Sequence, residues 1–283
     1  MKNIAKAILL KSLWHGLGRK NLVRLSRFLF NEARLDKQND AANNGERAVQ
    51  WQMLKKDQSR ERFCVFDVGA NVGNWTQSLL AIGVRFNRPI FVHAFEGCIN
   101  TCLTLENNLE QSSFRQQTQV NNIVLSSSKG KQRFYSSGSN AGTNGLYPLR
   151  EVNPEEQTVA EVETETIDGY CVQNGIFHID FLKVDTEGHD MEVLYGCNEL
   201  FTAGAIDIAQ FEYNHRWINS RHYLRDAFDY FKPLGYELGK ITPKGIEFYP
   251  AWDFELETFC EGNYLAVKPS LMSLFPQIPW WRE

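Results

Sequence analysis

The chain has 283 residues, of which 43% are hydrophobic and 23% are charged, the balance of a globular protein that can bury a sizeable core. No segment approaches the ~20 consecutive apolar residues that a membrane-spanning helix needs, so no transmembrane segment is predicted. The net charge of −4 conceals a division: residues 1–60 hold 13 lysines and arginines against five acidic residues, whereas the remainder holds 17 against 29.

Residues 1–60 are predicted to form a basic, helical N-terminal extension. Apolar residues recur at helical spacing through residues 1–35, and the pattern breaks near Gly16 and Gly18, so two amphipathic helices are expected. A polar linker and a further helix over residues 47–56 follow. The basic charge predicts a peripheral contact with a membrane face or another polyanion, and the extension is also a candidate interface of a homo-oligomer. The alternative is a solvated appendage.

Nothing near the N-terminus has the pattern of a secretion signal. The longest apolar run there, Ala7 to Leu10, is too short for a signal core, and no small-residue cleavage site follows it. Cytoplasmic residence is therefore expected, either free or peripheral at the inner membrane face. The six cysteines form no CxxC pair, so neither a zinc site nor a disulfide framework is predicted.

From residue 63 onward, expected strands and helices alternate. The expected strands span residues 63–68, 89–96, 118–126, 131–137, 177–185, 205–214, 235–241 and 263–269, and the expected helices span 71–82, 99–109, 191–201 and 223–231. This alternation predicts an α/β fold with a mostly parallel sheet and helices on both faces. The predicted organisation is a body at residues 61–270 followed by a C-terminal tail at residues 271–283.

Four of the predicted strands end in a carboxylate, at Asp67, Glu96, Asp185 and Glu212. In parallel sheets, ligands bind outside the carboxyl ends of the strands, so these side chains are expected at the rim of a binding site. An acidic rim is a poor cradle for phosphates. The strand ends therefore disfavour a cofactor that carries a pyrophosphate.

A glycine-rich turn follows the first predicted strand. It reads D-x-G-x-x-x-G, with Asp67, Gly69 and Gly73, rather than the G-x-G-x-x-G of a dinucleotide-binding fold. Asp67 would repel a pyrophosphate but attract S-adenosylmethionine, which carries an ammonium and a sulfonium and no phosphate. The glycines let the backbone approach such a ligand closely, and Glu96 is placed to accept hydrogen bonds from a ribose diol. The alternative is that the glycines mark only a tight turn.

Five ordered motifs carry a resemblance to a known family. They read FDVGANVGNWT, VHAFEG, TIDGYC, IDFLKVDTEGHDMEVLYG and FEYN, and they lie between residues 63 and 268. This order resembles that of the FkbM-type S-adenosylmethionine-dependent methyltransferases. The resemblance implies a Rossmann-like class I methyltransferase fold, with a seven-stranded sheet whose last strand is antiparallel. It also implies O-methylation, often of sugar hydroxyls in glycans or natural products. Residues 1–60 match nothing in the family.

The resemblance also implies a cofactor site, so that residues 61–270 become the predicted methyltransferase domain. By motif match, Glu96 would hold the ribose, and the methionine part would be lined by Asp67, Gly69, Asn71 and Gly73. The predicted site includes two further residues of the same turns, Ala70 and Gly97. The family pattern has a proline soon after the second-strand glutamate, and EGCIN departs from it here.

Two acidic clusters are the candidates for catalysis. The segment KVDTEGHD contains Asp185, Glu187 and His189, and QFEYNH contains Glu212, so the clusters are expected to face each other across the cleft mouth. In one mechanism, a carboxylate or His189 removes the proton of the acceptor as general base. In the other, Asp185, Glu187 and Glu212 hold a magnesium or calcium ion that lowers the pKa of the hydroxyl. Alternatively, these residues have local roles at the starts of helices.

The predicted function is S-adenosylmethionine-dependent O-methylation of a sugar hydroxyl, in a glycan or a glycosylated metabolite, as in polysaccharide biosynthesis. The expected partner is a carbohydrate or glycoconjugate acceptor, and no nucleic acid is expected. Residues 140–146, rich in glycine and asparagine, are expected to form a lid over the site, or else a hairpin tip. The alternatives are a lipid, protein or small-metabolite acceptor, and a non-catalytic binding protein on the same fold.

Overall fold

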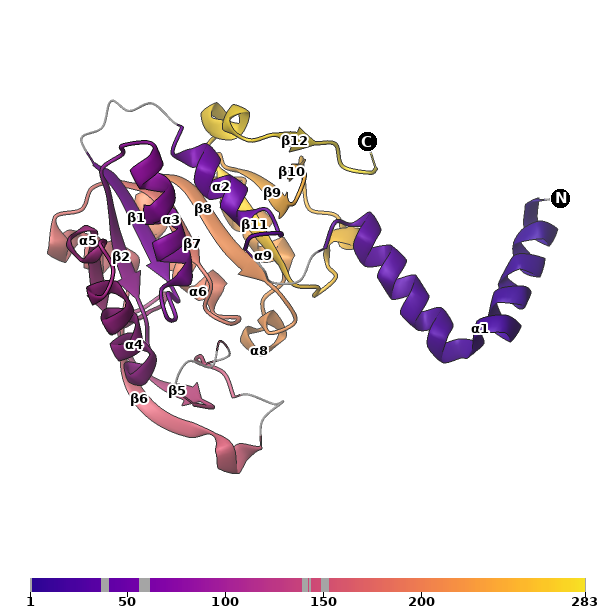
Figure 1. Cartoon of the computed structure of the whole chain (residues 1–283), viewed down its shortest axis with the longest axis horizontal. Helices are drawn as coiled ribbons and strands as arrows, with labels where there is room; N and C mark the ends of the chain where they lie inside the picture. Colours follow the sequence, from indigo (N-terminus) through magenta and orange to yellow (C-terminus); the bar gives the residue numbers. More distant parts are fainter. Residues whose placement is uncertain are drawn as a thin grey trace.

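The body is built around one large sheet of short apolar strands. The computed structural model describes residues 2–36, 41–55, 62–138, 142, 144–148 and 153–282. Within these residues, nine strands pair in the order β12-β10-β9-β11-β8-β7-β1-β2-β3 (Figure 1). They are β1 (Phe63–Val68), β2 (Ile90–Phe95), β3 (Thr118–Asn121), β7 (Ile179–Val184), β8 (Ile206–Tyr213), β9 (Glu237–Thr242), β10 (Gly245–Tyr249), β11 (Gly262–Val267) and β12 (Gln277–Ile278).

The direction of the strands defines the edge where a ligand can bind. The strands β3, β2, β1, β7 and β8 are parallel neighbours, so their carboxyl ends share one edge. The strand β11 runs antiparallel between β8 and β9, which completes the predicted seven-stranded, mostly parallel sheet with its antiparallel last strand. The described residues add β10 and β12 to this sheet. The sequence did not predict them because β10 follows β9 through a short turn and β12 spans only two residues.

Helices cover both faces of the sheet, as the sequence predicted. The helices of the body are α2 (Glu46–Met53), α3 (Asn74–Arg85), α4 (Ile99–Glu110), α5 (Ile167–Asn174), α6 (Asp190–Tyr195), α7 (Asn198–Thr202), α8 (Trp217–Ser220) and α9 (Leu224–Phe231). Short 3-10 turns lie at η1 (Arg115–Gln117), η2 (Pro154–Glu156), η3 (Phe254–Leu256) and η4 (Pro269–Leu274). Within β1, Phe63 and Val65 join the core under α2, α3 and α4, whereas Phe66 and Val68 join the core under α5, α6 and α9. This period of two places alternate residues of β1 in different cores.

A second sheet of three strands lies beside the carboxyl edge of the first. Its strands are β4 (Val124–Leu125), β6 (Thr158–Glu165) and β5 (Gly130–Ser136), in that order. The strand β5 was predicted, whereas the strand predicted over residues 118–126 is divided into β3 and β4 by Asn122 and Ile123. The strand β6 was not predicted, because its acidic sequence is largely exposed to solvent and lacks an apolar run.

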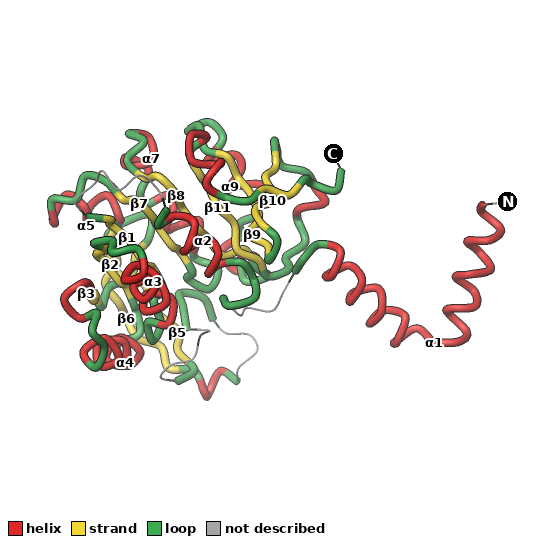
Figure 2. Tube along the Cα trace, turned by 45° about the horizontal axis from the view of Figure 1, so that its top comes forward, coloured by secondary structure: helices red, strands yellow, loops and turns green. Residues whose placement is uncertain are grey.

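The N-terminal extension forms α1 (Lys2–Ala33), which projects away from the body as two helical segments (Figures 1 and 2). The break lies at Gly18, whose φ of 70° and ψ of 162° are not helical. The predicted break near Gly16 and Gly18 is therefore confirmed. No helix among the described residues has both the length and the apolar character needed to cross a membrane.

Packing moves both predicted boundaries of the body. Val49 and Met53 of α2 are buried in the same core as α3, so the body begins near residue 46 rather than at residue 61. The predicted C-terminal tail also belongs to the body, because β12 pairs with β10 and the ring of Trp280 packs edge-on against Tyr249, with centroids 5.6 Å apart. The sequence could not show this, because the apolar residues of both segments find their partners far away in the chain.

Candidate functional site

A cavity of about 190 Å³ opens at the carboxyl edge of the large sheet. The turns after β1, β2 and β7 form one side, and residues of β4 and β5 together with Gly142 and residues 144–146 form the other. Seven of the residues predicted for the site line it: Gly69, Asn71, Glu96, Gly97, Asp185, Glu187 and His189. Four others, Asp67, Ala70, Gly73 and Glu212, do not. The predicted lid contributes Gly142 and residues 144–146, while Asn140, Ala141 and Thr143 lie outside the described residues.

Glu96 presents a fixed carboxylate to the cavity. Its Oε2 accepts a hydrogen bond from the backbone amide of Asn71 at 3.0 Å, and its Oε1 accepts one from the amide of Cys98 at 2.8 Å. Burial raises the pKa of this carboxyl, and the two amide hydrogen bonds oppose that rise. The side chain is thus locked in place by both flanking turns, with acceptor capacity remaining on each oxygen.

Glycines allow the turns around the cavity to approach one another. A Cβ at Gly69, where φ is +78°, would lie 1.9 Å from the carbonyl oxygen of Asp185. A Cβ at Gly97 would lie 2.5 Å from the side chain of Val124 and 2.8 Å from that of Phe134. Any other residue at either position would push apart the turns after β1 and β7, or the two sheets. The glycines of the predicted motif therefore shape the cavity through backbone proximity.

Asp67 lies beneath the turn rather than in the cavity. Its Oδ2 accepts a hydrogen bond from the hydroxyl of Thr76 at 2.6 Å, and its Oδ1 lies 3.7 Å from the ammonium of Lys183. The carboxyl is fully buried on the side of β1 that faces α3, and burial raises its pKa. Asp67 was predicted to line the methionine part of the cofactor, but it does not line this cavity, because alternation along β1 turns the side chain into the core.

Lys183 joins two of the predicted carboxylates. Its ammonium lies 3.0 Å from Oδ2 of Asp185, in addition to its contact with Asp67. The nearby carboxylates raise the pKa of this buried lysine and outweigh the effect of burial, so it stays charged. Asp185 lines the cavity and its side chain keeps 29% of its surface exposed, which makes it the accessible member of the group. The sequence contains a sign of this contact, because a lysine inside the apolar run FLKV must find a carboxylate partner once the strand is buried.

Glu187 points toward the same cavity but is paired. It forms an ion pair with Arg216, a residue that the sequence did not single out. The backbone of Glu187 has a positive φ of 57°, and that of Gly188 a φ of 96°. Two successive left-handed residues form a sharp turn between β7 and α6, and the turn directs the side chain of Glu187 across to Arg216.

His189 is buried between two hydroxyl groups. Its Nδ1 lies 3.0 Å from the hydroxyl of Tyr147, and its Nε2 lies 3.0 Å from the hydroxyl of Ser126. Burial lowers the pKa of the imidazole to about 4, so the ring is neutral at pH 7. Both ring nitrogens have partners, and the imidazole is a weak base, which speaks against His189 as general base. Neither Tyr147 nor Ser126 was predicted, since both come from segments far from the motifs.

Glu212 is buried next to Asp190 and does not reach the cavity. The amide of Glu212 donates to Oδ1 of Asp190 at 3.3 Å, and the side-chain amide of Asn214 donates to Oε2 of Glu212 at 2.5 Å. Burial, followed by the charges of Asp185 and Asp190, raises the pKa of Glu212 well above its usual range. Burial likewise raises the pKa of Asp190 to about 7. The two predicted clusters are adjacent, but only that of Asp185 opens to the cavity.

The predicted metal ligands do not form one ligand group. Asp185, Glu187 and Glu212 are held apart by their separate partners, Lys183, Arg216 and Asn214. Among the described residues, a group of three His, Cys, Asp or Glu side chains with ligand atoms within 4.8 Å of one another occurs only at His178, Asp180 and Asp207.

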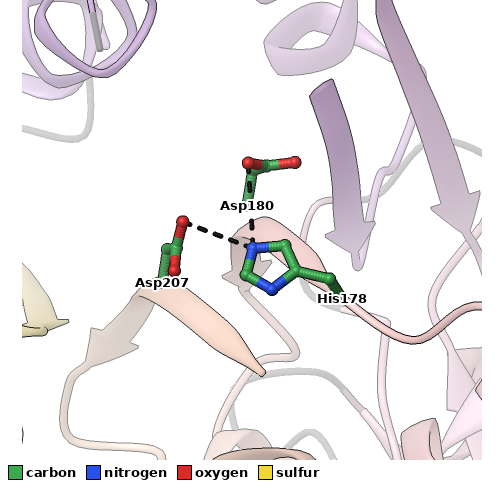
Figure 3. A group of neighbouring side chains, drawn as sticks. All are labelled: His178, Asp180 and Asp207. Atoms are coloured by element: carbon green, nitrogen blue, oxygen red, sulfur yellow. Dashed lines mark ion pairs between the residues drawn. The ribbon is translucent and has the colours of Figure 1, made fainter. Parts of the chain in front are cut away.

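These three side chains, drawn in Figure 3, lie at the amino ends of β7 and β8, whereas the cavity lies at the carboxyl ends. The Nε2 of His178 lies 3.3 Å from Asp207 and 3.8 Å from Asp180. Lys268 binds the other oxygen of Asp207 at 2.8 Å, and the amide of Cys64 donates to Asp180 at 2.8 Å. Lys268 and the amide of Cys64 thus already occupy one oxygen of each carboxylate, and the group is a polar network at the start of the two strands.

Two buried polar atoms of the cavity are left without a partner. Among the described residues, neither Oδ1 of Asn71 nor the hydroxyl of Thr186 makes a hydrogen bond, and both residues line the cavity. The described lining also contains no lysine or arginine, while it contains Glu96, Asp185 and Glu187. Buried polar atoms without partners are rare, so these two are candidates to bind a ligand.

The sheet order, the antiparallel strand beside β8 and a cavity at the carboxyl ends of β1 and β2 together define a Rossmann-like class I methyltransferase fold. The chain belongs to the FkbM methyltransferase family, because the model of the methyltransferase FkbM domain matches residues 67–238. Among the curated proteins, none matches the chain.

The chain is also similar, at low identity, to several solved structures. The methyltransferase FkbM from Methylobacillus flagellatus KT is 15% identical, with a TM-score of 0.44 over 76% of this chain and 47% of its own, so the chain spans about half of that protein. The precorrin-6y C5,15-methyltransferase from Geobacter metallireducens GS-15 is 9% identical, with a TM-score of 0.41 over 78% and 87%. The N-terminal domain of human METTL16 is 12% identical, with a TM-score of 0.40 over 79% and 67%.

Proposed function

We propose that this protein transfers the methyl group of S-adenosylmethionine to a hydroxyl of a sugar, in a glycan or a glycosylated metabolite. The observation that carries the proposal is the fixed carboxylate of Glu96 in a cavity whose described lining has acidic side chains but no lysine or arginine. Such a cavity favours a cationic, phosphate-free nucleoside over a dinucleotide. The family of the chain supports the same cofactor.

The residues around the cavity fit this cofactor. Glu96 would accept hydrogen bonds from the ribose diol, since both of its oxygens retain acceptor capacity. The backbone of the turn at Gly69 and the unpartnered Oδ1 of Asn71 would hold the methionine part, where the ammonium is a donor. Apolar side chains of Val124 and Leu125 would cover a flat base. When bound, S-adenosylmethionine supplies a methyl group already activated by its sulfonium.

Asp185 is the residue we assign to proton removal. Lys183 holds Oδ2, which leaves Oδ1 to accept the proton of the acceptor hydroxyl. Arg216 fixes Glu187 on the same wall, where Glu187 would orient the acceptor by accepting a hydrogen bond from a neighbouring hydroxyl. His189 would hold this wall in place through Ser126 and Tyr147 rather than move a proton.

The lining also supports a sugar as the acceptor. Carboxylates, the amide of Asn144 and the hydroxyl of Thr186 are groups that bind a neutral polyol, and phosphate-bearing acceptors such as nucleic acids would be repelled by the acidic wall. The carboxylate of Asp185, held by Lys183, would take the proton of the sugar hydroxyl. Lipid, protein and small-metabolite acceptors remain the alternatives to be separated by experiment.

The test has two steps, binding and transfer. Calorimetry on the full chain should detect binding of S-adenosylmethionine or S-adenosylhomocysteine. It should detect no binding of NADH or of a nucleotide sugar. A panel of methyl glycosides, oligosaccharides, lipids, peptides and metabolites is then assayed for S-adenosylhomocysteine release, and mass spectrometry locates the new methyl. Asp185→Asn should lower turnover by about 10²–10⁴-fold, the usual contribution of a general base, while cofactor affinity changes little. Tighter binding of a pyrophosphate-bearing nucleotide would overturn the cofactor assignment, and transfer only to peptides or lipids would overturn the acceptor.

A further inference from the structure

The helix α1 leaves a long apolar surface uncovered. Eight large apolar side chains between residues 10 and 30 are exposed, and their list is Leu10, Trp14, Leu17, Val23, Leu25, Phe28, Leu29 and Phe30. Phe28 is 60% exposed and Trp14 is 52% exposed, although these residues would normally be buried. Figure 1 shows that both segments of α1 stand clear of the body. So many exposed apolar side chains on neighbouring turns mark an interaction site.

The second segment of α1 separates apolar and basic residues by face. At about 100° per residue, Leu25, Leu29, Leu22, Phe30 and Val23 fall within an arc of about 160°, and Phe28 widens this apolar side to about 220°. Arg19, the first residue after the break, also falls within the arc. Three basic residues, Lys20, Arg24 and Arg27, fall together within a stripe of about 60° that borders this arc. A broad apolar face bordered by lysine and arginine is the pattern of a helix that lies in a membrane interface.

The first segment has the same character on one face. Leu10, Trp14 and Leu17 are spaced four and three residues apart, which places them on one side of the helix. Tryptophan is enriched at the level of the lipid headgroups, because its ring is apolar and its N–H is polar. The break at Gly18 lets each segment turn its apolar face independently toward a flat surface.

The base of α1 is fixed to the body. Arg34 donates to the carbonyl oxygen of Glu255 at 3.3 Å, and Asp36 pairs with the buried Lys240 of β9. The charge of the two parts is opposite in sign, because residues 1–60 are basic and the remainder is acidic. An anionic surface would therefore attract α1 and repel the body, so α1 would hold the body at a defined point of attachment.

We propose that α1 is a peripheral anchor that lays its apolar face into an anionic lipid surface. A second copy of the chain is the main rival. It is disfavoured because a two-helix seam needs a narrower stripe than this arc, and because the basic stripes of two paired helices would repel each other. A nucleic acid would use the basic stripe but leave the apolar arc uncovered. The proposal does not depend on the methyltransferase reaction.

Vesicle flotation with the full chain tests the proposal. We expect binding to phosphatidylcholine vesicles that contain phosphatidylglycerol, at least tenfold stronger than to pure phosphatidylcholine, and weakened by added salt. Replacing Lys20, Arg24 and Arg27 together by Gln should reduce binding roughly a hundredfold, at about fivefold for each charge. The double variant L25S/L29S should abolish binding, because it removes the centre of the apolar arc.

Controls distinguish the anchor from its rivals. Lys131→Gln changes an exposed charge on β5 and should leave vesicle binding unchanged. All variants should retain the circular dichroism and cofactor affinity of the parent, since α1 lies outside the body. Equal binding to neutral and anionic vesicles would overturn the role of the basic stripe. Absence of vesicle binding, with a dimer in ultracentrifugation that L25S/L29S dissociates, would assign α1 to self-association instead.

Discussion

Carboxylates gather at both edges of the large sheet, yet the two edges differ in what surrounds them. At the amino edge, Asp180 and Asp207 are met by His178, Lys268 and a backbone amide. At the carboxyl edge, Glu96 and Asp185 face a cavity whose described lining has no lysine or arginine. The same residue type therefore serves structure at one edge and forms a ligand site at the other.

The difference shows that the position of a carboxylate on a strand decides its role. A side chain that alternation turns into a core must find a cation or a donor there, as Asp67 does with Lys183 and Thr76. A side chain in the turn beyond the strand can keep acceptor capacity for a ligand, as Glu96 does. Four predictions test this division, and the first two concern the buried groups Asp67 and His189.

The largest effect is expected for Asp67→Ala. This change removes one member of a buried ion pair and leaves Lys183 with less compensation, which costs about 3–5 kcal/mol of unfolding free energy. Urea unfolding followed by circular dichroism measures the loss. The variant protein that remains folded should bind S-adenosylmethionine almost as well as the parent, because Asp67 does not line the cavity. A loss of affinity at unchanged stability would place Asp67 in the cofactor site after all.

The second prediction concerns His189 and pH. Because burial lowers the pKa of the folded imidazole to about 4, the unfolded chain takes up a proton first as the pH falls. The contribution of His189 to the free energy of unfolding is therefore complete above about pH 6.5. It is lost as the pH falls from about 6.5 to about 4, and the total loss is about 3 kcal/mol. His189→Gln should remove that part of the pH dependence. Urea unfolding of both proteins at several pH values measures it, and parallel pH profiles would contradict a neutral, buried imidazole.

Most of the fold could be predicted from the sequence, because each parallel strand is an apolar run followed by a helix of period 3.6. The runs FCVFDV and FHIDFLKVD became β1 and β7. The elements that were missed lack such runs: β6 is acidic and exposed, and β12 has two residues. The placement of α2 was also missed, because its partners in the core lie far away in the chain.

The site was predictable only in part. Sequence order placed Glu96 and Asp185 at strand ends, and the structure brings both to one cavity. It could not show which side of the sheet each side chain takes, so Asp67 and Glu212 were assigned to a cavity that neither lines. Partners such as Arg216 come from remote segments and leave no motif.

The third prediction is a loss of cofactor affinity in Glu96→Gln. The neutral amide keeps the size of the side chain but removes the charge-assisted hydrogen bonds to the ribose, which are worth about 1.5–3 kcal/mol, or roughly ten- to hundredfold in Kd. Calorimetry with S-adenosylhomocysteine measures the change. Asp180→Asn at the amino edge is the matched control and should leave Kd unchanged. An equal loss of cofactor affinity in Glu96→Gln and Asp180→Asn would mean that the amino edge of the sheet also affects cofactor binding.

The smallest effect is expected at the amino edge itself. Lys268→Met removes the ammonium that binds Oδ1 of Asp207 at 2.8 Å and leaves the ring of His178, 3.3 Å from the other oxygen, as a neighbouring side chain. Because the lysine is partly exposed to water, the cost should be about 1 kcal/mol of unfolding free energy, measured by urea unfolding. Cofactor affinity and turnover should stay at parental values, since no atom of this network reaches the cavity. A change in cofactor affinity with little change in stability would instead show that the strands β7 and β8 couple their two ends.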